Sequence, residues 1–191
     1  ELPQVLNPES GYLYNANNTP FKSTSTNENP NSKDFPKEMG YSLYDNNRST
    51  RIYELIESYE KIDFSDFKSI KFDYKYPTPF TFNFVDVNEI MDMNPDDYPD
   101  ISDLIIEIQN WDRSTSSDSL GAGIFAIFYY NLGKYIRKPY INRNLSKNLI
   151  AQMLRDVKAY MVKHFNKTNV RLGEYQKLVR GCLLYTSPSP R

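Results

Sequence analysis

The chain is organised around the stretch GYLYNANNTPF, residues 11–21. Tyr12 and Tyr14 alternate as they would on one face of a β-strand, and Thr19-Pro20 ends the extended pattern. An asparagine at the end of a rigid strand can direct its side-chain amide into a cleft. The asparagines within residues 15–18 therefore include a candidate oxyanion donor.

A helical pattern begins near Arg48, one linker downstream of this stretch. Apolar side chains recur there at helical spacing and predict one buried face: Ile52, Leu55, Ile56 and Tyr59. Arg48 lies at the entry to the predicted helix, where its side chain can reach outward into a site. The alternative is a solvated arginine in a surface ion pair, worth about 0–1 kcal/mol.

The rest of the sequence predicts short extended segments first and helices later. Residues 1–21 fit a β-hairpin, residues 22–40 fit a long polar loop, and residues 81–90 are ambiguous between strand and helix. Helices are predicted at about 65–73, 102–111, 118–136 and 146–164, with caps at Ser65, Ser102 and Ser146. The 118–136 helix is apolar nearly all round, so we expect it at the centre of its layer.

Composition argues against several classes of function. The 191 residues are 39% hydrophobic and 25% charged, which suits a globular domain with a buried core. The net charge is −1, from 23 basic and 24 acidic residues, so we expect no nucleic-acid or membrane partner. No apolar run approaches the roughly 18 residues of a membrane span. Glu1 begins the chain without an initiator Met or a signal peptide, and we expect an internal fragment.

Searches for standard catalytic motifs are negative. The sequence has no glycine-rich phosphate loop, no His pair or Cys cluster at metal spacing, and no Gly-x-Ser-x-Gly elbow. Its only histidine, His164, lies beside an apolar stripe near a helix C-terminus and is interpreted as structural. The single Cys182 cannot form an internal disulfide. On these residues alone the function stays undecided.

Four segments together resemble a known family. They are NANNTPF at residues 15–21, NRSTRI at 47–52 followed by Leu55, the run from Leu104 to Trp111-Asp112 with Asp118 and Phe125, and LGEYQKLVRG at 172–181. In order and spacing they are similar to the β-chain of the penicillin acylase family. Within it they look most like acyl-homoserine lactone acylases and related aliphatic amide hydrolases. The resemblance covers roughly residues 3–181.

This resemblance implies an N-terminal-nucleophile hydrolase, in which a self-cleaved precursor exposes a serine whose own α-amine serves as the base. Asn17 matches the family's oxyanion-hole asparagine, and Arg48 matches the arginine that orients it. These two are the predicted catalytic residues. For Asn17, the alternative from the residues alone is a turn-forming asparagine. The family pattern places the nucleophile before Glu1, so we expect this chain alone to be inactive.

The resemblance also implies the fold and the setting of the enzyme. The expected fold is α+β, a partial αββα N-terminal-nucleophile hydrolase fold with short N-terminal strands followed by a mainly helical region. The expected partners are a small acyl amide and the α-chain and upstream β-chain of the same precursor, in the periplasm or outside a bacterial cell. No cofactor is expected in this chain. A structural calcium ion, as in penicillin acylases, is left open because the linker carboxylate Asp34 does not align with theirs.

Residues 1–181 are predicted to form the acylase part of the chain, and residues 182–191 resemble translated sequencing-adapter read-through, so we expect a non-native tail. The expected reaction is hydrolysis of acyl amides such as N-acyl-homoserine lactones through an acyl-serine intermediate. The alternatives are an acylase of penicillin or cephalosporin β-lactams and a non-catalytic helical binding module.

Overall fold

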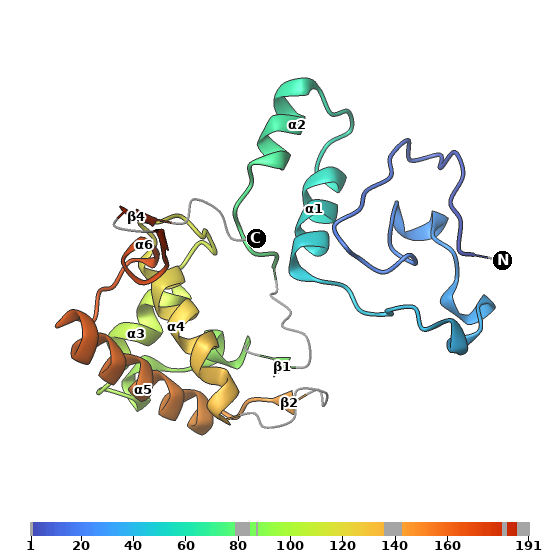
Figure 1. Cartoon of the computed structure of the whole chain (residues 1–191). Helices are drawn as coiled ribbons and strands as arrows, with labels where there is room; N and C mark the ends of the chain where they lie inside the picture. Colours follow the sequence, from blue (N-terminus) through green and yellow to red (C-terminus); the bar gives the residue numbers. More distant parts are fainter. Residues whose placement is uncertain (1, 79–84, 87, 136–142, 181–182, 187–191) are drawn as a thin grey trace. The chain divides into compact units, whose positions relative to one another are not determined.

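The computed structural model describes residues 2–78, 85–86, 88–135, 143–180 and 183–186. Two compact units divide the chain, one spanning Glu1–Asp73 and the other Tyr74–Arg191. The described residues are mainly helical, and their strands form two small two-stranded sheets. In Figure 1 the colour runs from blue at the start of the first unit to red at the end of the second.

The first unit consists of loops, three 3-10 helices and two α-helices. The 3-10 helices are η1 (Thr26–Glu28), η2 (Ser32–Asp34) and η3 (Lys37–Met39). The α-helices are α1 (Asn47–Glu57) and α2 (Phe64–Lys71), which pack against each other. The blue N-terminal loops of this unit lie beside α1 in Figure 1.

The predicted N-terminal hairpin is wrong, because residues 2–46 are all described and contain no β-strand. Residues 12–18, called the arm below, are tied to the following loop mostly through side chains. The Tyr14 N–H donates to the Ser23 carbonyl at 2.9 Å, but the Tyr12 carbonyl accepts from the Thr24 hydroxyl at 2.8 Å. A two-stranded ribbon is marginal without further strands, and hydroxyl and amide side chains compete here for the backbone groups. An ordered polar loop therefore replaces the hairpin.

Helix α1 confirms the helix predicted from Arg48 onward and begins with a capping box. The Asn46 side chain accepts from the Ser49 N–H at 3.0 Å, while the Asn46 N–H donates to Oγ of Ser49 at 3.3 Å. These two bonds satisfy backbone donors that a helix start leaves open.

Helix α2 is capped by Asp63, not by Ser65 as predicted. The Asp63 carboxylate accepts from the Asp66 N–H at 2.8 Å, and a negative group at a helix N-terminus is favoured by the helix dipole. Beyond α2 the chain is fastened back to α1 by an ion pair between Arg51 and Asp73 at 2.8 Å. This pair lies within the first unit.

The second unit contains helices and two small sheets. Its helices are η4 (Asn88–Asp92), η5 (Pro95–Asp97), α3 (Ser102–Gln109), α4 (Leu120–Tyr135), α5 (Lys147–Phe165) and α6 (Leu172–Tyr175). Its strands are β1 (Val85–Asp86) parallel to β2 (Arg143–Asn144), and β3 (Lys177–Arg180) antiparallel to β4 (Leu183–Thr186). Helices α3, α4 and α5 confirm the last three predicted helices, and Ser146 caps α5 as predicted. Ser102 is the first residue of α3 and not its cap, which is Ile101.

Helix α4 packs on α3, α5 and α6, as its apolar sequence predicts. Figure 1 shows α3, α4 and α5 grouped together in this unit. The core of this unit is built from large apolar side chains, among them Leu104, Ile105, Ile108, Ile124, Phe125, Phe128, Ile150, Met153, Leu154, Val157 and Met161. Burying one such side chain contributes about 1.5–3 kcal/mol, so apolar burial is the main source of stability here.

The first unit has a different interior. Its buried residues are small or polar, namely Ala16, Thr19, Thr24 and Ser49. Because little apolar surface is removed from water, the conformation of this unit depends on hydrogen bonds between side chains and backbone. The candidate site lies in this unit.

Some predictions fall on residues outside the described ranges. Within the ambiguous segment 81–90, residues 81–84 and 87 lie outside, while Val85–Asp86 form β1 and Asn88 begins η4. The predicted boundary between residues 181 and 182 also lies outside. Of the described helices, none has the length and apolar character needed to cross a bilayer. The predicted mainly helical region is confirmed, and the described residues form no αββα layers.

Candidate catalytic site

The arm contains a tight turn, and Asn17 lies in this turn. Its backbone has the left-handed conformation, with φ of +59°. The Asn17 N–H donates to Oδ1 of Asn15 at 2.9 Å, and the Ala16 N–H donates to Oδ1 of Asn18 at 2.7 Å. Asparagine enters this conformation more readily than most residues, because its short side chain can bond to the local backbone. The asparagine cluster thus forms a tight turn, and Asn17 is exposed on it.

Arg48 reaches the arm from the first turn of α1. Its Nη2 donates to Oδ1 of Asn17 at 2.6 Å and to the carbonyl of Ala16 at 2.8 Å. The structure therefore brings together the two residues that the sequence singled out. Hydrogen bonds from a charged guanidinium are short and strong. Because Arg48 binds Oδ1, the Nδ2 end of the Asn17 amide is left to donate to another group.

Asn46, directly before α1, makes a second link to the arm. Its Nδ2 donates to the carbonyls of Ala16 at 3.0 Å and Asn17 at 3.1 Å. Its Oδ1 accepts from the Ser49 N–H at 3.0 Å and caps α1. One side chain therefore joins the helix N-terminus to the turn that carries Asn17.

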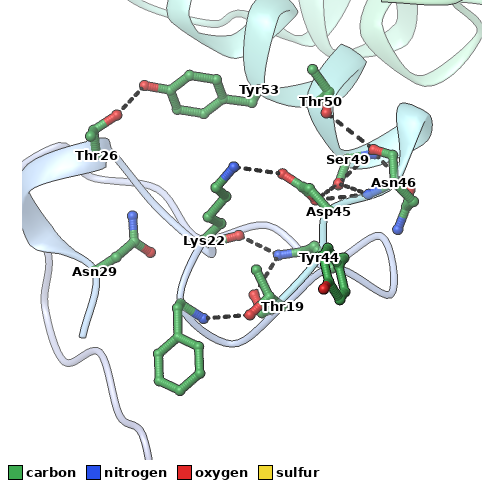
Figure 2. A network of polar contacts seen from close by, with 12 residues as sticks. Thr19, Lys22, Thr26, Asn29, Tyr44, Asp45, Asn46, Ser49, Thr50 and Tyr53 are labelled. Carbon is green, nitrogen blue, oxygen red and sulfur yellow. Dashed lines mark hydrogen bonds and ion pairs between the residues drawn. The ribbon is translucent and has the colours of Figure 1, made fainter. Parts of the chain in front are cut away.

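A polar network around the start of α1 holds Asn46 in place, as Figure 2 shows. The Asp45 carboxylate accepts from the Ser49 hydroxyl and from the Asn46 N–H, the latter at 3.1 Å. Lys22 forms an ion pair with Asp45 at 3.5 Å. Ser49 is fully buried, and its Oγ also lies 2.9 Å from the Asn46 carbonyl oxygen and accepts from the Asn46 N–H at 3.3 Å, so its hydroxyl has several partners within this network.

Tyrosines attach the beginning of the arm to α1. The Tyr14 ring lies 6.5 Å from the Tyr12 ring and 6.4 Å from the Tyr53 ring, measured between centroids. The Tyr12 hydroxyl donates to the carboxylate of Glu57, and the Tyr53 hydroxyl bonds to that of Thr26 at 2.8 Å, also visible in Figure 2. These contacts hold the arm on one side of the helix that carries Arg48.

Alkaline pH is expected to weaken this attachment. Burial, then the charge of Asp45, then the nearby Tyr53 raise the pKa of Tyr14 from 10.0 to about 12. The folded state therefore favours the neutral phenol, and its contribution to stability is complete below about pH 10 and is lost as the pH rises through about 12. We expect the urea midpoint of the wild-type chain to fall more steeply over that interval than the midpoint of Tyr14→Phe. Parallel curves for the two proteins would contradict this assignment.

Sequence reasoning missed Asp45, Asn46 and Ser49 as parts of the site. A signal for Asn46 existed, because an asparagine close to the start of a helical pattern is a typical N-cap residue. The hydrogen bonds from Nδ2 of Asn46 to the arm could not be predicted from that pattern. The carbonyls that bind its Nδ2 lie 29 and 30 residues earlier in the chain.

His164 belongs to the second unit and packs against Tyr160 of the same helix, with ring centroids 4.3 Å apart and ring planes tilted by 37°. Its interpretation as a structural residue stays a prediction. Among the described residues, no group of three or more His, Cys, Asp or Glu could hold a metal ion. Asp34, the linker carboxylate considered for calcium, is the exposed last residue of η2. The described part of the chain thus presents no acidic cluster of the kind that binds calcium.

An asparagine amide backed by a guanidinium is the kind of group that stabilises a developing oxyanion in amide-cleaving hydrolases. The sequence matches the family model described as penicillin amidase over residues 1–184. Because this match spans nearly all of the chain, the chain belongs to the penicillin amidase family. The family consists of amide hydrolases, so the chain is assigned to an acylase or amidase at that level. Comparison with curated proteins found no match.

Proposed function

We propose that the chain is part of an acylase that hydrolyses acyl amides through a covalent acyl-serine, on the N-terminal-nucleophile plan. The observation that carries the proposal is the hydrogen bond from Arg48 to Oδ1 of Asn17, which leaves an oriented Nδ2 donor. Membership of the penicillin amidase family supports the same reaction class. In this proposal the nucleophile belongs to a part of the precursor outside the printed sequence.

The proposed reaction has two halves that use the same donor. The serine Oγ attacks the amide carbonyl carbon, its proton passes to the serine's own α-amine, and the carbonyl oxygen takes up the electron pair. Nδ2 of Asn17 donates to this oxyanion. The C–N bond then breaks, and the amine leaves with the proton from the α-ammonium. Water attacks the acyl-serine ester in the same way and releases the carboxylic acid.

Arg48 acts on this step through Asn17. Its two hydrogen bonds hold the amide plane and the preceding carbonyl, so the donor is oriented before the substrate arrives. A cation bound to Oδ1 also polarises the amide, which makes the N–H a stronger donor. Arginine suits this role because its planar guanidinium presents several N–H donors in a rigid arrangement and can bind more than one oxygen acceptor.

Replacing Arg48 with methionine is expected to lower kcat of the full-length enzyme by about 10- to 100-fold with little change in KM, since a charge-assisted hydrogen bond contributes about 1.5–3 kcal/mol. Methionine keeps a long side chain but removes both donors. Arg155→Met is the matched control, because Arg155 pairs with Asp100 on the surface of the second unit. Steady-state kinetics measure kcat and KM of both variants. Equal kcat values for the two variants would contradict the proposed role of Arg48.

The proposed substrates are N-acyl-homoserine lactones and related aliphatic acyl amides, cleaved at the amide with the lactone ring intact. The test is a comparison of kcat/KM for lactones of several acyl lengths and for a penicillin with an aromatic side chain, followed by release of the free amine. A preference for the penicillin would overturn the substrate class. Failure to hydrolyse any of these amides would favour the non-catalytic binding module.

The proposal also includes the partners, the location and the complete fold that the family resemblance implies. The α-chain and the upstream β-chain of the precursor are the proposed partners, and the periplasm or the outside of a bacterial cell is the proposed location. Strands from those partners would complete the layered hydrolase fold, which the short strands of the described residues cannot form alone. Fractionation of cells that express the full-length protein tests the location.

A further inference from the structure

The turn that carries Asn17 is held by more than Arg48. Nδ2 of Asn46 donates to the carbonyl of Ala16 at 3.0 Å and to the carbonyl of Asn17 at 3.1 Å. The first carbonyl belongs to the peptide group before the Asn17 Cα, and the second belongs to the peptide group after it. One amide group therefore binds both peptide planes from which the Asn17 side chain projects.

This arrangement determines where the Asn17 side chain can point. Asn17 has a φ of +59°, a conformation that non-glycine residues rarely adopt and that the surroundings must hold in place. Fixing the peptide planes on both sides of a Cα fixes the direction of its Cα–Cβ bond. Arg48 then fixes the end of the side chain, because it binds Oδ1 at 2.6 Å.

Asn46 is itself rigid, because its other end is built into α1. Oδ1 accepts from the Ser49 N–H at 3.0 Å, and the backbone N–H of Asn46 donates to Oγ of Ser49 and to Asp45. Ser49 is fully buried. Figure 2 shows Asn46 within this network at the start of the helix. The turn is thus held in a fixed position relative to the start of α1 by direct hydrogen bonds, and not only through the loop that connects the two.

We propose that Asn46 is a positioning residue, which holds the backbone of Asn17 so that its Nδ2 meets the oxyanion. This inference rests on the proposed function of Asn17 and adds a third residue to the site. Asn46 does not touch the substrate in this proposal. It acts through its two hydrogen bonds to the turn, whereas Arg48 acts through the Asn17 side chain.

Capping and positioning use opposite ends of the Asn46 amide, so they can be separated. Aspartate and serine both cap helices well, and either one keeps an acceptor for the Ser49 N–H. Neither can supply the amide group that donates to both carbonyls. Asn46→Asp additionally places a negative oxygen against them, whereas Asn46→Ser removes the donor without adding charge.

The test measures kcat and KM of the full-length enzyme with Asn46→Asp and Asn46→Ser, on an N-acyl-homoserine lactone. The concentration of active sites is determined by titration, and kcat is calculated per active site. A loss of folded protein then does not lower the kcat that is compared. We expect kcat to fall about tenfold in both variants with KM changed less than twofold, because the donor is needed when the oxyanion forms. Asn31→Asp is the matched control, since Asn31 caps η2 through the Lys33 N–H at 3.0 Å.

A double variant provides the second readout. If Asn46 acts through Asn17, Asn46→Asp lowers kcat in the wild type but not in Asn17→Ala, where the oriented amide is already gone. Equal effects in both backgrounds, or site-corrected kcat values equal to that of Asn31→Asp, would overturn the positioning role. Failure of the proposed function looks different, because then Asn17→Ala alone would leave kcat unchanged.

Discussion

Replacing Asn17 with alanine is expected to lower kcat of the full-length enzyme by about 10²–10³, the usual effect of removing one oxyanion donor. The folded structure should survive, because Asn17 is exposed and its side chain is not part of a core. The expected result is therefore a large loss of turnover with only a small fall in the urea midpoint, because alanine adopts the left-handed conformation of Asn17 less readily than asparagine does. Steady-state kinetics and equilibrium unfolding on the same samples measure the two quantities.

A second substitution at this position tests the chemistry of the donor. Asn17→Asp keeps the shape of the side chain and its contact with Arg48, but it presents an oxygen where Nδ2 was. We expect a loss of kcat at least as large as in Asn17→Ala, because a carboxylate repels an oxyanion. Asn27→Ala, at an exposed asparagine in η1, serves as the control. Turnover close to that of the control in both Asn17 variants would remove the oxyanion assignment.

Replacing Gly123 with alanine is expected to destabilise the second unit by about 3 kcal/mol, the upper end of the usual cost of overpacking. A Cβ at Gly123 would lie 2.1 Å from the carbonyl oxygen of Val170 and 3.0 Å from the carbonyl carbon of Arg171. These are backbone atoms of the segment that leads into α6, so they cannot yield by a simple rotamer change. Urea unfolding of the 191-residue chain measures the loss.

Helix α4 supplies the matched control for this prediction. Gly133 lies in the same helix, and a Cβ added there meets nothing within 4 Å. Gly133→Ala should therefore stabilise the helix by about 0.5–1 kcal/mol, because alanine loses less backbone entropy on folding. If Gly123→Ala were as stable as Gly133→Ala, α4 would not approach the backbone at Val170 as closely as the structure shows.

The helices could be predicted from the sequence because their signals are local. The spacing of Ile52, Leu55 and Ile56 predicted α1, and the apolar character of residues 118–136 predicted the central position of α4. For α1 to α5 the errors were confined to the helix ends, whereas the short helix α6 and the 3-10 helices were not predicted. Asp63 caps α2 in place of Ser65, since several polar residues near a helix start compete for the same N–H groups.

The strands could not be predicted in the same way. Residues 12–16 have the alternation of a strand, but a strand needs a partner to bond with, and the neighbouring loop offers hydroxyls and amides instead. In the candidate site, too, some features could be predicted from the sequence and others could not. Asn17 and Arg48 were found because the short motifs that contain them resemble those of a known family. The contact between them and the hydrogen bonds of Asn46 to the turn depend on folding.

By itself the sequence determined the helical segments, the negative result for metal and phosphate motifs, and the choice of Asn17 and Arg48 as the residues to examine. These features depend on side chains within a few turns of each other or on the resemblance of short motifs to those of a known family. Only the tertiary structure decided that Arg48 binds the oxygen of the Asn17 amide and that Asn46 holds its backbone. The reason is that a left-handed turn and the start of a helix, about 30 residues apart, meet through hydrogen bonds whose geometry no local pattern encodes.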